Sequence, residues 1–477
     1  MCWEVFVVDL VARYRGRIAG FLFAALATPL MLSGLAYSQW SGDAKQNNAV
    51  CVGPGDKWST AITADGSGGA ILAWQDERNG NFDIFAQKVD LSGKILWTLD
   101  GVAVCPDTLQ QGYPELASDG AGGAVLAWCD DRGGNCDVFT QKINSSGEPV
   151  WASGGIAVCK ARGGRTAPAI VSDGFGGAII VWHDNRNGSF DIYGQRIDAS
   201  GKIVWGSGGT AICTADANQL YPVVMSDGAG GVIVVWDDAR NGNHDLFAQR
   251  VNSAGDIEWA FNGVEVCTAA GNQMNPAMVS DGSGGATIVW HDKRGANYDI
   301  FAQRLNASGK ALWPSDGIVV SAANGDQSSP SVTMDGAGGA IVAWYDKRNG
   351  DYDIYAQKIS ATGVPQWLPD GISVCTVAGD QMYPVVVSDG TGGAIVAWHD
   401  NRDSNYDIYA ERIDASGAIQ WTRDGVVLCA APGDQSCPTI AADGAGGAII
   451  SWNDPRNIRG DIYAQRIDRQ GNLRVTR

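Results

Sequence analysis

The sequence predicts an all-β fold, an eight-bladed β-propeller of four-stranded antiparallel blades, closed by the N-terminal strand completing the last blade. Three observations predict it. An Asp-Gly pair recurs every 54 residues from Asp65 to Asp443, and a tryptophan recurs with the same period from Trp74 to Trp452. The two ends of the chain each hold part of the eighth blade. A fixed period of this length is typical of repeat proteins.

Each repeat contains four strand-like runs, which we name strands a to d. In the seventh repeat they cover residues 383–388, 394–399, 408–413 and a last run ending at 426–429. Asp389 and Gly390 begin the a–b turn, where glycines provide the positive φ that a tight hairpin requires. Four antiparallel strands per repeat make one propeller blade.

The two ends of the chain favour a closed ring over an open solenoid, because a solenoid needs capping repeats with polar outer faces. The eighth repeat has strands a to c and ends at Arg477, whereas residues 40–51 have the pattern of a strand d. Cys51 is in phase with the cysteines that end strand d in other repeats. We therefore expect these end segments to share one blade, which leaves no exposed sheet edge.

The repeat motif S-D-G-x-G-G-x-x-x-x-W-x-D-x-R-N-G-x-x-D-I-Y resembles the blade pattern of TolB-type propellers. The turn from Ile197 to Trp205 is similar to the tryptophan-docking turn of quinoprotein propellers, which also have eight blades. Together these resemblances cover nearly all of residues 40–477 and imply a bacterial secreted β-propeller repeat protein. Propellers serve many unrelated functions, so the resemblance implies the fold rather than an activity.

The N-terminus has the pattern of an export signal. Arg13, Arg15 and Arg17 precede an apolar run over 18–35, and small residues follow up to Ser38. We predict a signal peptide over 1–38, a single propeller domain over 39–477, a periplasmic or extracellular location, and no stable membrane insertion after cleavage. An uncleaved membrane anchor is the alternative.

Charge and cysteine usage narrow the range of partners. The formal net charge of −18 argues against nucleic acid and anionic membranes as partners. We expect a monomer. The strand-d cysteines recur once per blade and are predicted to be buried, whereas Cys129 and Cys136 occupy facing positions on one hairpin. In an exported protein this pair predicts a disulfide.

The segment Asp-x-Arg-Asn-Gly-x-x-Asp between strands b and c has carboxylates at a spacing that calcium loops use. Its third position, however, is an arginine in all eight repeats: Arg78, Arg132, Arg186, Arg240, Arg294, Arg348, Arg402 and Arg456. A fixed positive charge there favours a structural ion pair, with the guanidinium forked between the two aspartates of its turn. We predict no metal and no cofactor, with a calcium site in a blade loop as the alternative.

Histidine recurs directly after the strand-b tryptophan in three blades, as His183, His291 and His399. Each histidine is predicted to pack on the aromatic residue seven positions later. A shared zinc ion is excluded, because these blades are not adjacent and zinc requires ligands near ~2.1 Å.

The d–a loops vary between repeats more than the other turns, so the face formed by the d–a loops and b–c turns is the predicted binding face. The candidate ligand-binding residues are Arg162, Arg165, Gln219, Gln273, Gln381 and Glu115. We expect the loop side chains to be exposed and replaceable without loss of the fold. For the glutamines, hydrogen bonding to the loop backbone is an equal alternative.

The sequence predicts a non-catalytic binding or scaffold module for a protein or a glycan. No residues are assigned a catalytic role, because nearly every polar group recurs eightfold and no nucleophile has a matching base. The alternative is a secreted carbohydrate-active hydrolase or lyase with a funnel site on the same face, using Glu115 beside Arg162 and Arg165. Acid–base catalysis usually needs two tuned groups, and Glu115 is a single one.

Overall fold

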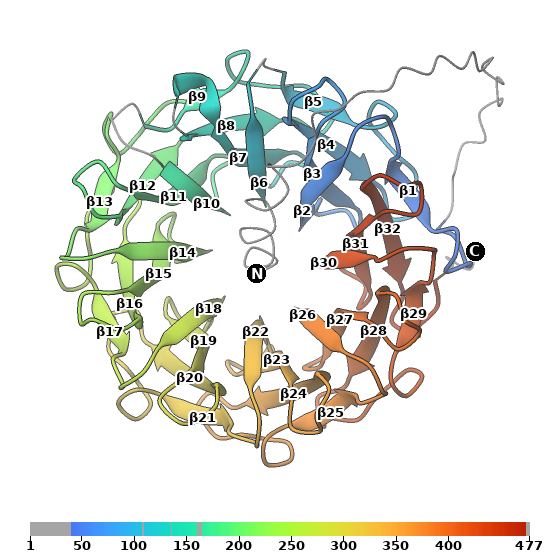
Figure 1. The fold of residues 1–477 in the computed structure, drawn as a ribbon. Helices are drawn as coiled ribbons and strands as arrows, with labels where there is room; N and C mark the ends of the chain where they lie inside the picture. The colour runs from blue at the N-terminus through green and yellow to red at the C-terminus, as the bar shows by residue number, and fades with distance from the viewer. Residues whose placement is uncertain (1–39, 107–108, 135, 160–164, 474–477) are drawn as a thin grey trace, which may run out of the picture.

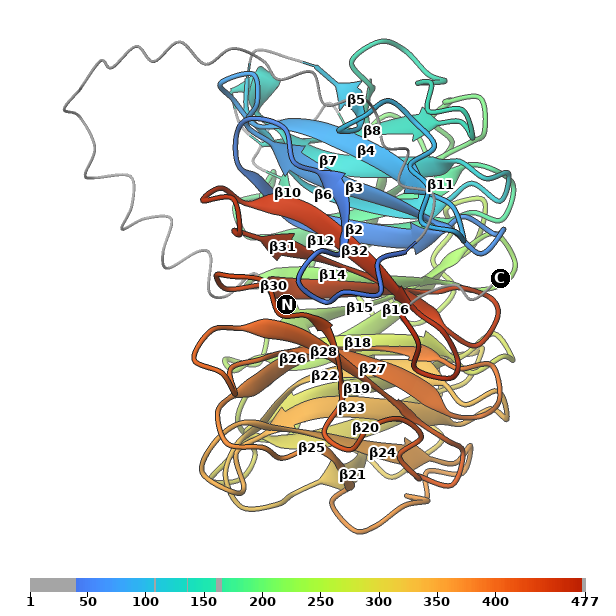
Figure 2. The same ribbon diagram turned by 90° about the vertical axis from the view of Figure 1, so that its right-hand side faces the viewer.

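The computed structural model describes residues 40–106, 109–134, 136–159 and 165–473. In these residues, eight sheets of four antiparallel strands form a ring (Figure 1), which confirms the predicted propeller. Strand a of each blade lies nearest the central axis and strand d lies at the outer rim. Figure 2 shows the same ring from the side.

The strand bounds repeat from blade to blade. Strands a are β2 (Lys57–Ala64), β6 (Gln111–Ser118), β10 (Arg165–Ser172), β14 (Gln219–Ser226), β18 (Gln273–Ser280), β22 (Gln327–Met334), β26 (Gln381–Ser388) and β30 (Ser436–Ala442). Strands b are β3 (Ala70–Asp76), β7 (Ala124–Asp130), β11 (Ala178–Asp184), β15 (Val232–Asp238), β19 (Ala286–Asp292), β23 (Ala340–Asp346), β27 (Ala394–Asp400) and β31 (Ala448–Asp454).

The outer strands follow the same pattern. Strands c are β4 (Asp83–Val89), β8 (Asp137–Ile143), β12 (Asp191–Ile197), β16 (Asp245–Val251), β20 (Asp299–Leu305), β24 (Asp353–Ile359), β28 (Asp407–Ile413) and β32 (Asp461–Ile467). Strands d are β5 (Val102–Cys105), β9 (Ile156–Ala157), β13 (Thr210–Cys213), β17 (Val264–Cys267), β21 (Ile318–Ser321), β25 (Ile372–Cys375), β29 (Val426–Cys429) and β1 (Asn48–Cys51). One short 3-10 helix, η1 (Asp131–Gly133), lies in the second blade.

The core lies between adjacent blades. Strand b is buried along its whole length in most blades, because both of its faces are covered by neighbouring blades. The strand-b tryptophans are 0% exposed, and the indole nitrogen of Trp398 donates to Asp400 Oδ2 at 2.9 Å. Trp290 of the fifth blade packs in one cluster with Ile233 of the fourth. Tryptophan side chains buried in this way contribute a large apolar area to the core.

The a–b turn shows why the Asp-Gly pair recurs. Asp389 Oδ1 accepts hydrogen bonds from the backbone nitrogens of Thr391 at 2.8 Å and Gly393 at 2.9 Å. Gly390 has φ of 73°, in the left-handed region that favours glycine. A Cβ atom on Gly393 would lie 2.2 Å from the carbonyl oxygen of Ile413, so no larger residue fits.

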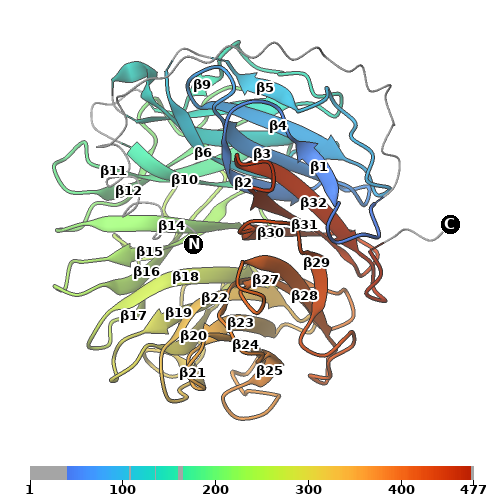
Figure 3. The same cartoon turned by 45° about the vertical axis from the view of Figure 1, so that its right-hand side comes forward.

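The ring closes as the two chain ends predict. β1 pairs antiparallel with β32, so the first described strand completes the last blade (Figure 3). Trp40 is 1% exposed, and its indole nitrogen donates to the carbonyl oxygen of Leu91 at 2.9 Å. Lys57, at the start of β2, is buried and lies 3.2 Å from Asp461 of β32. The junction is therefore held by backbone pairing, an aromatic side chain and a buried ion pair.

No helix in the described part of the chain is long and apolar enough to cross a membrane. The predicted signal peptide over 1–38 lies outside the described residues.

Candidate binding face

We call the end of the ring that carries the b–c turns and the d–a loops the loop face. Its b–c turns are built on the recurrent arginine. In the fourth blade, Arg240 Nε donates to Asp238 Oδ1 at 2.8 Å, and its guanidinium lies 3.8 Å from the Phe247 ring centroid. The second aspartate, Asp245, instead accepts from Asn241 at 2.6 Å. The predicted ion pair is present, but the expected sharing between both aspartates is wrong.

The same arginines join neighbouring blades. Arg240 Nη2 donates to Cys213 Sγ at 3.1 Å, and Cys213 ends strand d of the preceding blade. Cys213 is 1% exposed, which confirms the predicted burial of the strand-d cysteines. Burial raises the pKa of this thiol to about 12, so it stays protonated. The cysteines are therefore hydrogen-bond acceptors as well as small apolar side chains.

The candidate glutamines begin strand a, directly after the d–a loops. Gln219, Gln273 and Gln381 are all 0% exposed, so the expectation that they are exposed is wrong. Gln381 Nε2 donates to the carbonyl oxygens of Val377 at 3.1 Å and Gly379 at 2.7 Å, and Gln327 and Gln435 make the same pair of bonds. These bonds satisfy the loop backbone. Direct ligand contact by these glutamines stays a prediction.

The other candidates lie in the second and third blades. Arg162 falls outside the described residues, and Arg165 begins β10, where its backbone pairs with Asp184. Glu115 lies in the neighbouring innermost strand β6, opposite Ala127. Burial raises the pKa of its carboxyl to about 7. The fold thus places Glu115 and Arg165 on the innermost strands of neighbouring blades and distributes the three glutamines over separate blades.

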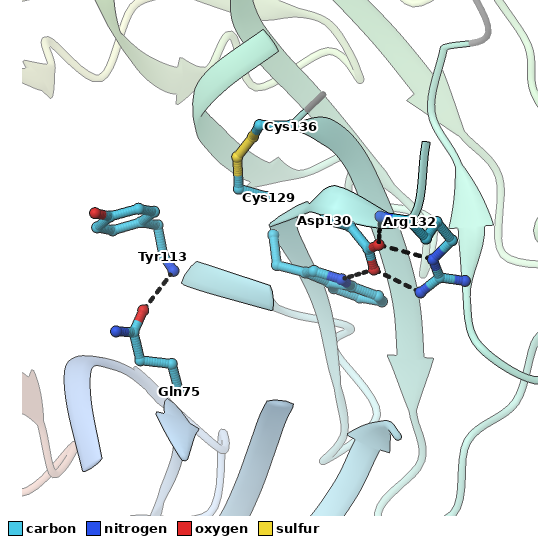
Figure 4. Close-up of a disulfide and its surroundings, with 7 residues drawn as sticks. Gln75, Tyr113, Cys129, Asp130, Arg132 and Cys136 are labelled. Carbon is cyan, nitrogen blue, oxygen red and sulfur yellow. Dashed lines mark hydrogen bonds and ion pairs between the residues drawn. A yellow bond between two sulfur atoms is a disulfide. The ribbon is translucent and has the colours of Figure 1, made fainter. Parts of the chain in front are cut away.

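The predicted disulfide is present. Cys129 and Cys136 are bonded across the b–c hairpin of the second blade, with their Cα atoms 5.4 Å apart (Figure 4). In the same view, Gln75 of the first blade accepts a hydrogen bond from the backbone nitrogen of Tyr113 at 3.1 Å. The position after the strand-b tryptophan therefore contacts the next blade as well as its own hairpin.

The predicted packing of each histidine on the residue seven positions later is confirmed. The ring centroids are 5.1 Å apart for His183 and Phe190, 4.7 Å for His291 and Tyr298, and 4.6 Å for His399 and Tyr406.

An aromatic network on the loop face was not predicted from the sequence. Tyr345 lies 5.0 Å from Tyr352 and 5.6 Å from Tyr383 of the next blade, measured between ring centroids. Tyr383 lies 5.1 Å from His399, which contacts Tyr406. Five rings therefore form one continuous group across the sixth and seventh blades. Its sequence signal is an aromatic residue directly before the strand-a proline, as in Tyr383-Pro384.

The network includes a backbone conformation that is costly for most residues. Tyr383 has φ of +52°, in the left-handed region, and six other described residues at this strand-a position share it: Ser59, Tyr113, Tyr221, Asn275, Ser329 and Cys437. The register of strands a and b shifts between Met382 and Val385, which marks a β-bulge at this point. Bulges redirect side chains, and here the bulge turns the Tyr383 ring toward its neighbours.

The loop face also differs in charge around the ring. In the described residues, a side-chain oxygen from seven of the d–a loops accepts from the b–c turn backbone of the preceding blade. It is an amide oxygen for Phe82 (Gln110), Phe190 (Asn218) and His244 (Asn272). It is a carboxylate oxygen for Tyr298 (Asp326), Tyr352 (Asp380), Tyr406 (Asp434) and Gly460 (Asp56). We call the three aspartates that bond to a tyrosine backbone, Asp326, Asp380 and Asp434, the acidic arc.

His291 and His399 are buried among the aromatic rings of this face. Burial lowers the pKa of His291 and of His399 to about 4, so both imidazoles are neutral at neutral pH. Within the described residues, neither ring nitrogen of either side chain has a hydrogen-bond partner. A general base must reach the proton that it removes. The contacts of both histidines are those of packed side chains.

Comparisons with known proteins give structural likeness only. No family model and no curated protein matches the chain. An ulvan lyase of a polysaccharide lyase family is similar over 90% of this chain and 97% of its own, at 9% identity and a TM-score of 0.46. An α-L-arabinanase of Penicillium chrysogenum is similar over 65% and 94%, at 12% identity and 0.35. A TolB-type protein of Agrobacterium tumefaciens is similar over 56% and 83%, at 16% identity and 0.33.

Proposed function

We propose that this chain is a non-catalytic binding or scaffold protein that uses its loop face to hold a protein or a glycan. The observation that carries the proposal is the coincidence of the five-ring network and the acidic arc on one side of that face. Elsewhere the polar groups of the blades recur as structural contacts. Partly exposed aromatic rings supply binding energy, and carboxylates supply charge preference.

A periplasmic or extracellular location belongs to this proposal. The disulfide between Cys129 and Cys136 supports it, because such bonds persist in oxidising compartments.

The proposal is tested by probing the purified protein with an array of glycans and with the exported proteins of its host. Replacement of Tyr221 and Tyr383 by alanine should weaken binding to whatever is retained, because Tyr221 is 52% exposed and Tyr383 belongs to the network. Lys310→Glu, on the c–d turn at the opposite end of the ring, should leave binding unchanged. Equal effects of both changes would contradict the proposal.

A secreted hydrolase or lyase with a funnel site on this face is the second candidate. One observation favours it: Glu115 is a carboxyl with a raised pKa on an innermost strand, and it makes no hydrogen bond or ion pair with the described residues. Turnover of a polysaccharide by the purified protein, abolished by Glu115→Gln, would establish this function and overturn the first.

A further inference from the structure

In the fifth and sixth blades, a lysine lies over the tyrosine whose backbone bonds to an aspartate of the acidic arc. In the fifth blade, Lys293 Nζ lies 4.6 Å from the centroid of the Tyr298 ring and 3.6 Å from Asp326 Oδ1. In the sixth, Lys347 Nζ lies 4.8 Å from the Tyr352 ring. An ammonium group is attracted by the face of an aromatic ring and by a nearby carboxylate. In these two blades, therefore, a tyrosine ring next to an aspartate already holds the ammonium group of a lysine from the same blade.

The seventh blade has the same ring and the same carboxylate. Tyr406 lies 4.6 Å from His399 at an interplanar angle of 47°, and Tyr298 lies 4.7 Å from His291 at 45°. The backbone nitrogen of Tyr406 donates to Asp434 Oδ1 at 3.0 Å, as that of Tyr298 donates to Asp326 at 2.9 Å. The tyrosine ring is thus held in the same way in both blades.

The seventh blade lacks the lysine. Asn401 occupies the position of Lys293 and Lys347, and it bonds to the side chain of Tyr406. Within the described part of the chain, no lysine or arginine lies over the Tyr406 ring. Asp380 and Asp434 both act electrostatically on Tyr406. The seventh blade therefore keeps the negative charge next to the tyrosine ring but has no lysine to neutralise it.

We propose that Tyr406, Asp434 and Asp380 form a binding site for the ammonium group of a lysine side chain on a protein partner. The inference deepens the proposed binding function and rests on it. Lysine is the ligand chosen because the equivalent places in the fifth and sixth blades are filled by lysine side chains of this chain. Asp434 is exposed and the Tyr406 ring is partly exposed, so a partner reaches both from solvent.

The test uses a capped tetralysine peptide, with binding to the intact protein measured by calorimetry at low ionic strength. Asn401→Lys should weaken binding about tenfold, because the new side chain covers the ring as Lys347 does. Asp434→Asn should weaken it several-fold. An asparagine already makes the equivalent backbone bond at Asn218, so this change removes charge and keeps the turn.

Matched variants separate the site from general charge. Ala239→Lys adds the same charge at the equivalent position of the fourth blade, which has His244 and Asn272 in place of the tyrosine and aspartate. It should leave binding unchanged. Lys347→Asn should open a second site in the sixth blade and double the stoichiometry. Melting curves should show that all four variants are folded.

Several outcomes would overturn the proposal. Unchanged binding by Asn401→Lys would do so, and so would an equal loss in Ala239→Lys, which would indicate attraction to the overall negative charge. Tighter binding of a glucosamine oligomer than of tetralysine would overturn the choice of lysine. If the peptide fails to bind while Tyr221→Ala with Tyr383→Ala still weakens retention of a partner, this inference fails and the proposed function stands.

Discussion

Glu411 is the one acidic residue at a strand-c position where the other seven blades have glutamine: Gln87, Gln141, Gln195, Gln249, Gln303, Gln357 and Gln465. In the sixth blade, Gln357 Nε2 donates to the carbonyl oxygen of Leu368 at 2.7 Å. Glu411 Oε1 accepts from the backbone nitrogens of Arg412 at 2.8 Å and Trp421 at 2.9 Å. Its Oε2 is buried without a hydrogen-bond partner.

This arrangement favours a protonated carboxyl. The repeat places a carbonyl oxygen, that of Thr422, opposite Glu411 Oε2, so a proton on Oε2 would convert a repulsive contact into a hydrogen bond. Burial raises the pKa of Glu411 to about 7. No charged side chain offsets this effect, because Arg412 pairs with Asp389 at 2.7 Å and the exposed Arg423 pairs with Asp424 at 3.7 Å.

Replacing Glu411 by glutamine should therefore stabilise the protein above neutral pH. The folded-state pKa is raised, so the stability from protonated Glu411 is fully present below the unfolded pKa near 4.5 and is lost as pH rises through about 7. We expect Glu411→Gln to add about 3 kcal/mol to the free energy of unfolding at pH 8 and little at pH 4. Urea unfolding between these pH values measures the difference.

Gln357→Glu provides the matched control, because it should transfer the same pH dependence to the sixth blade. Parallel stability curves for the wild type and Glu411→Gln across this pH range would contradict a buried, protonated Glu411.

Ile458 is a second residue that departs from the repeat. It is 98% exposed and has φ of 76°, at a b–c turn position where five other blades have glycine. A β-branched residue in the left-handed region is strained by about 1–2 kcal/mol. Ile458→Gly should raise the free energy of unfolding by about 1 kcal/mol. Ile458→Val should give no gain, and a gain equal to that of glycine would show that the strain is absent.

At the scale of the element, the contact between Arg240 and Cys213 shows how a b–c turn is fixed to the preceding blade. The fifth blade ends with Ser321 instead of cysteine, and Arg348 Nη2 donates to Ser321 Oγ at 3.3 Å. Cys213→Ser should therefore cost less than ~1 kcal/mol. Cys213→Val removes one of three acceptors of Arg240 Nη2, which keeps Asp238 Oδ2 and the carbonyl oxygen of Asn262, so it should cost about 1 kcal/mol more than Cys213→Ser. Equal melting temperatures for the two variants would show that Cys213 serves packing alone.

The element scale also shows what the sequence could and could not predict. The burial of Cys213 follows from its period and residue type. Its bond to Arg240 does not, because the two lie 27 residues apart in different blades and meet only when the blades pack. The variable loops predict exposed glutamines, and the recurrence of these glutamines predicts backbone bonding as an equal alternative. The structure shows the backbone bonds, since Gln381 bonds to its loop as Gln327 does.

At the scale of the whole molecule, the constant 54-residue period made the closed ring predictable. It gave no indication of the candidate site, which depends on departures from the repeat. Closure follows from Cys51 being in phase with the other strand-d cysteines, and β1 pairs with β32 as that phase requires. The site depends instead on single substitutions within the repeat, such as Asn401 in place of lysine. The effect of such a substitution can be judged only from the positions of the side chains around Tyr406, which the sequence spacing does not give.

Removal of the closing strand should destabilise the whole ring. A chain that begins at Gly53 loses Trp40, Val50 and Cys51 from the core and leaves β32 as an open edge. Loss of the tryptophan alone costs about 3–5 kcal/mol, and an open edge recruits other chains. We expect a lower melting temperature or oligomers on size exclusion. A chain that begins at Gln39 is the control, and an unchanged monomer from Gly53 would contradict the role of β1.

The pairing of β1 with β32 also sets an order in time. β1 is made before the other strands of the ring and its partner β32 after them, and Asn47 bonds to the carbonyl oxygen of Leu428 across 381 residues. The seven blades that are continuous in sequence can each form as they emerge, because their contacts are local. The eighth cannot. Until β32 has been made, β1 stays without its partner, and the ring cannot close before then.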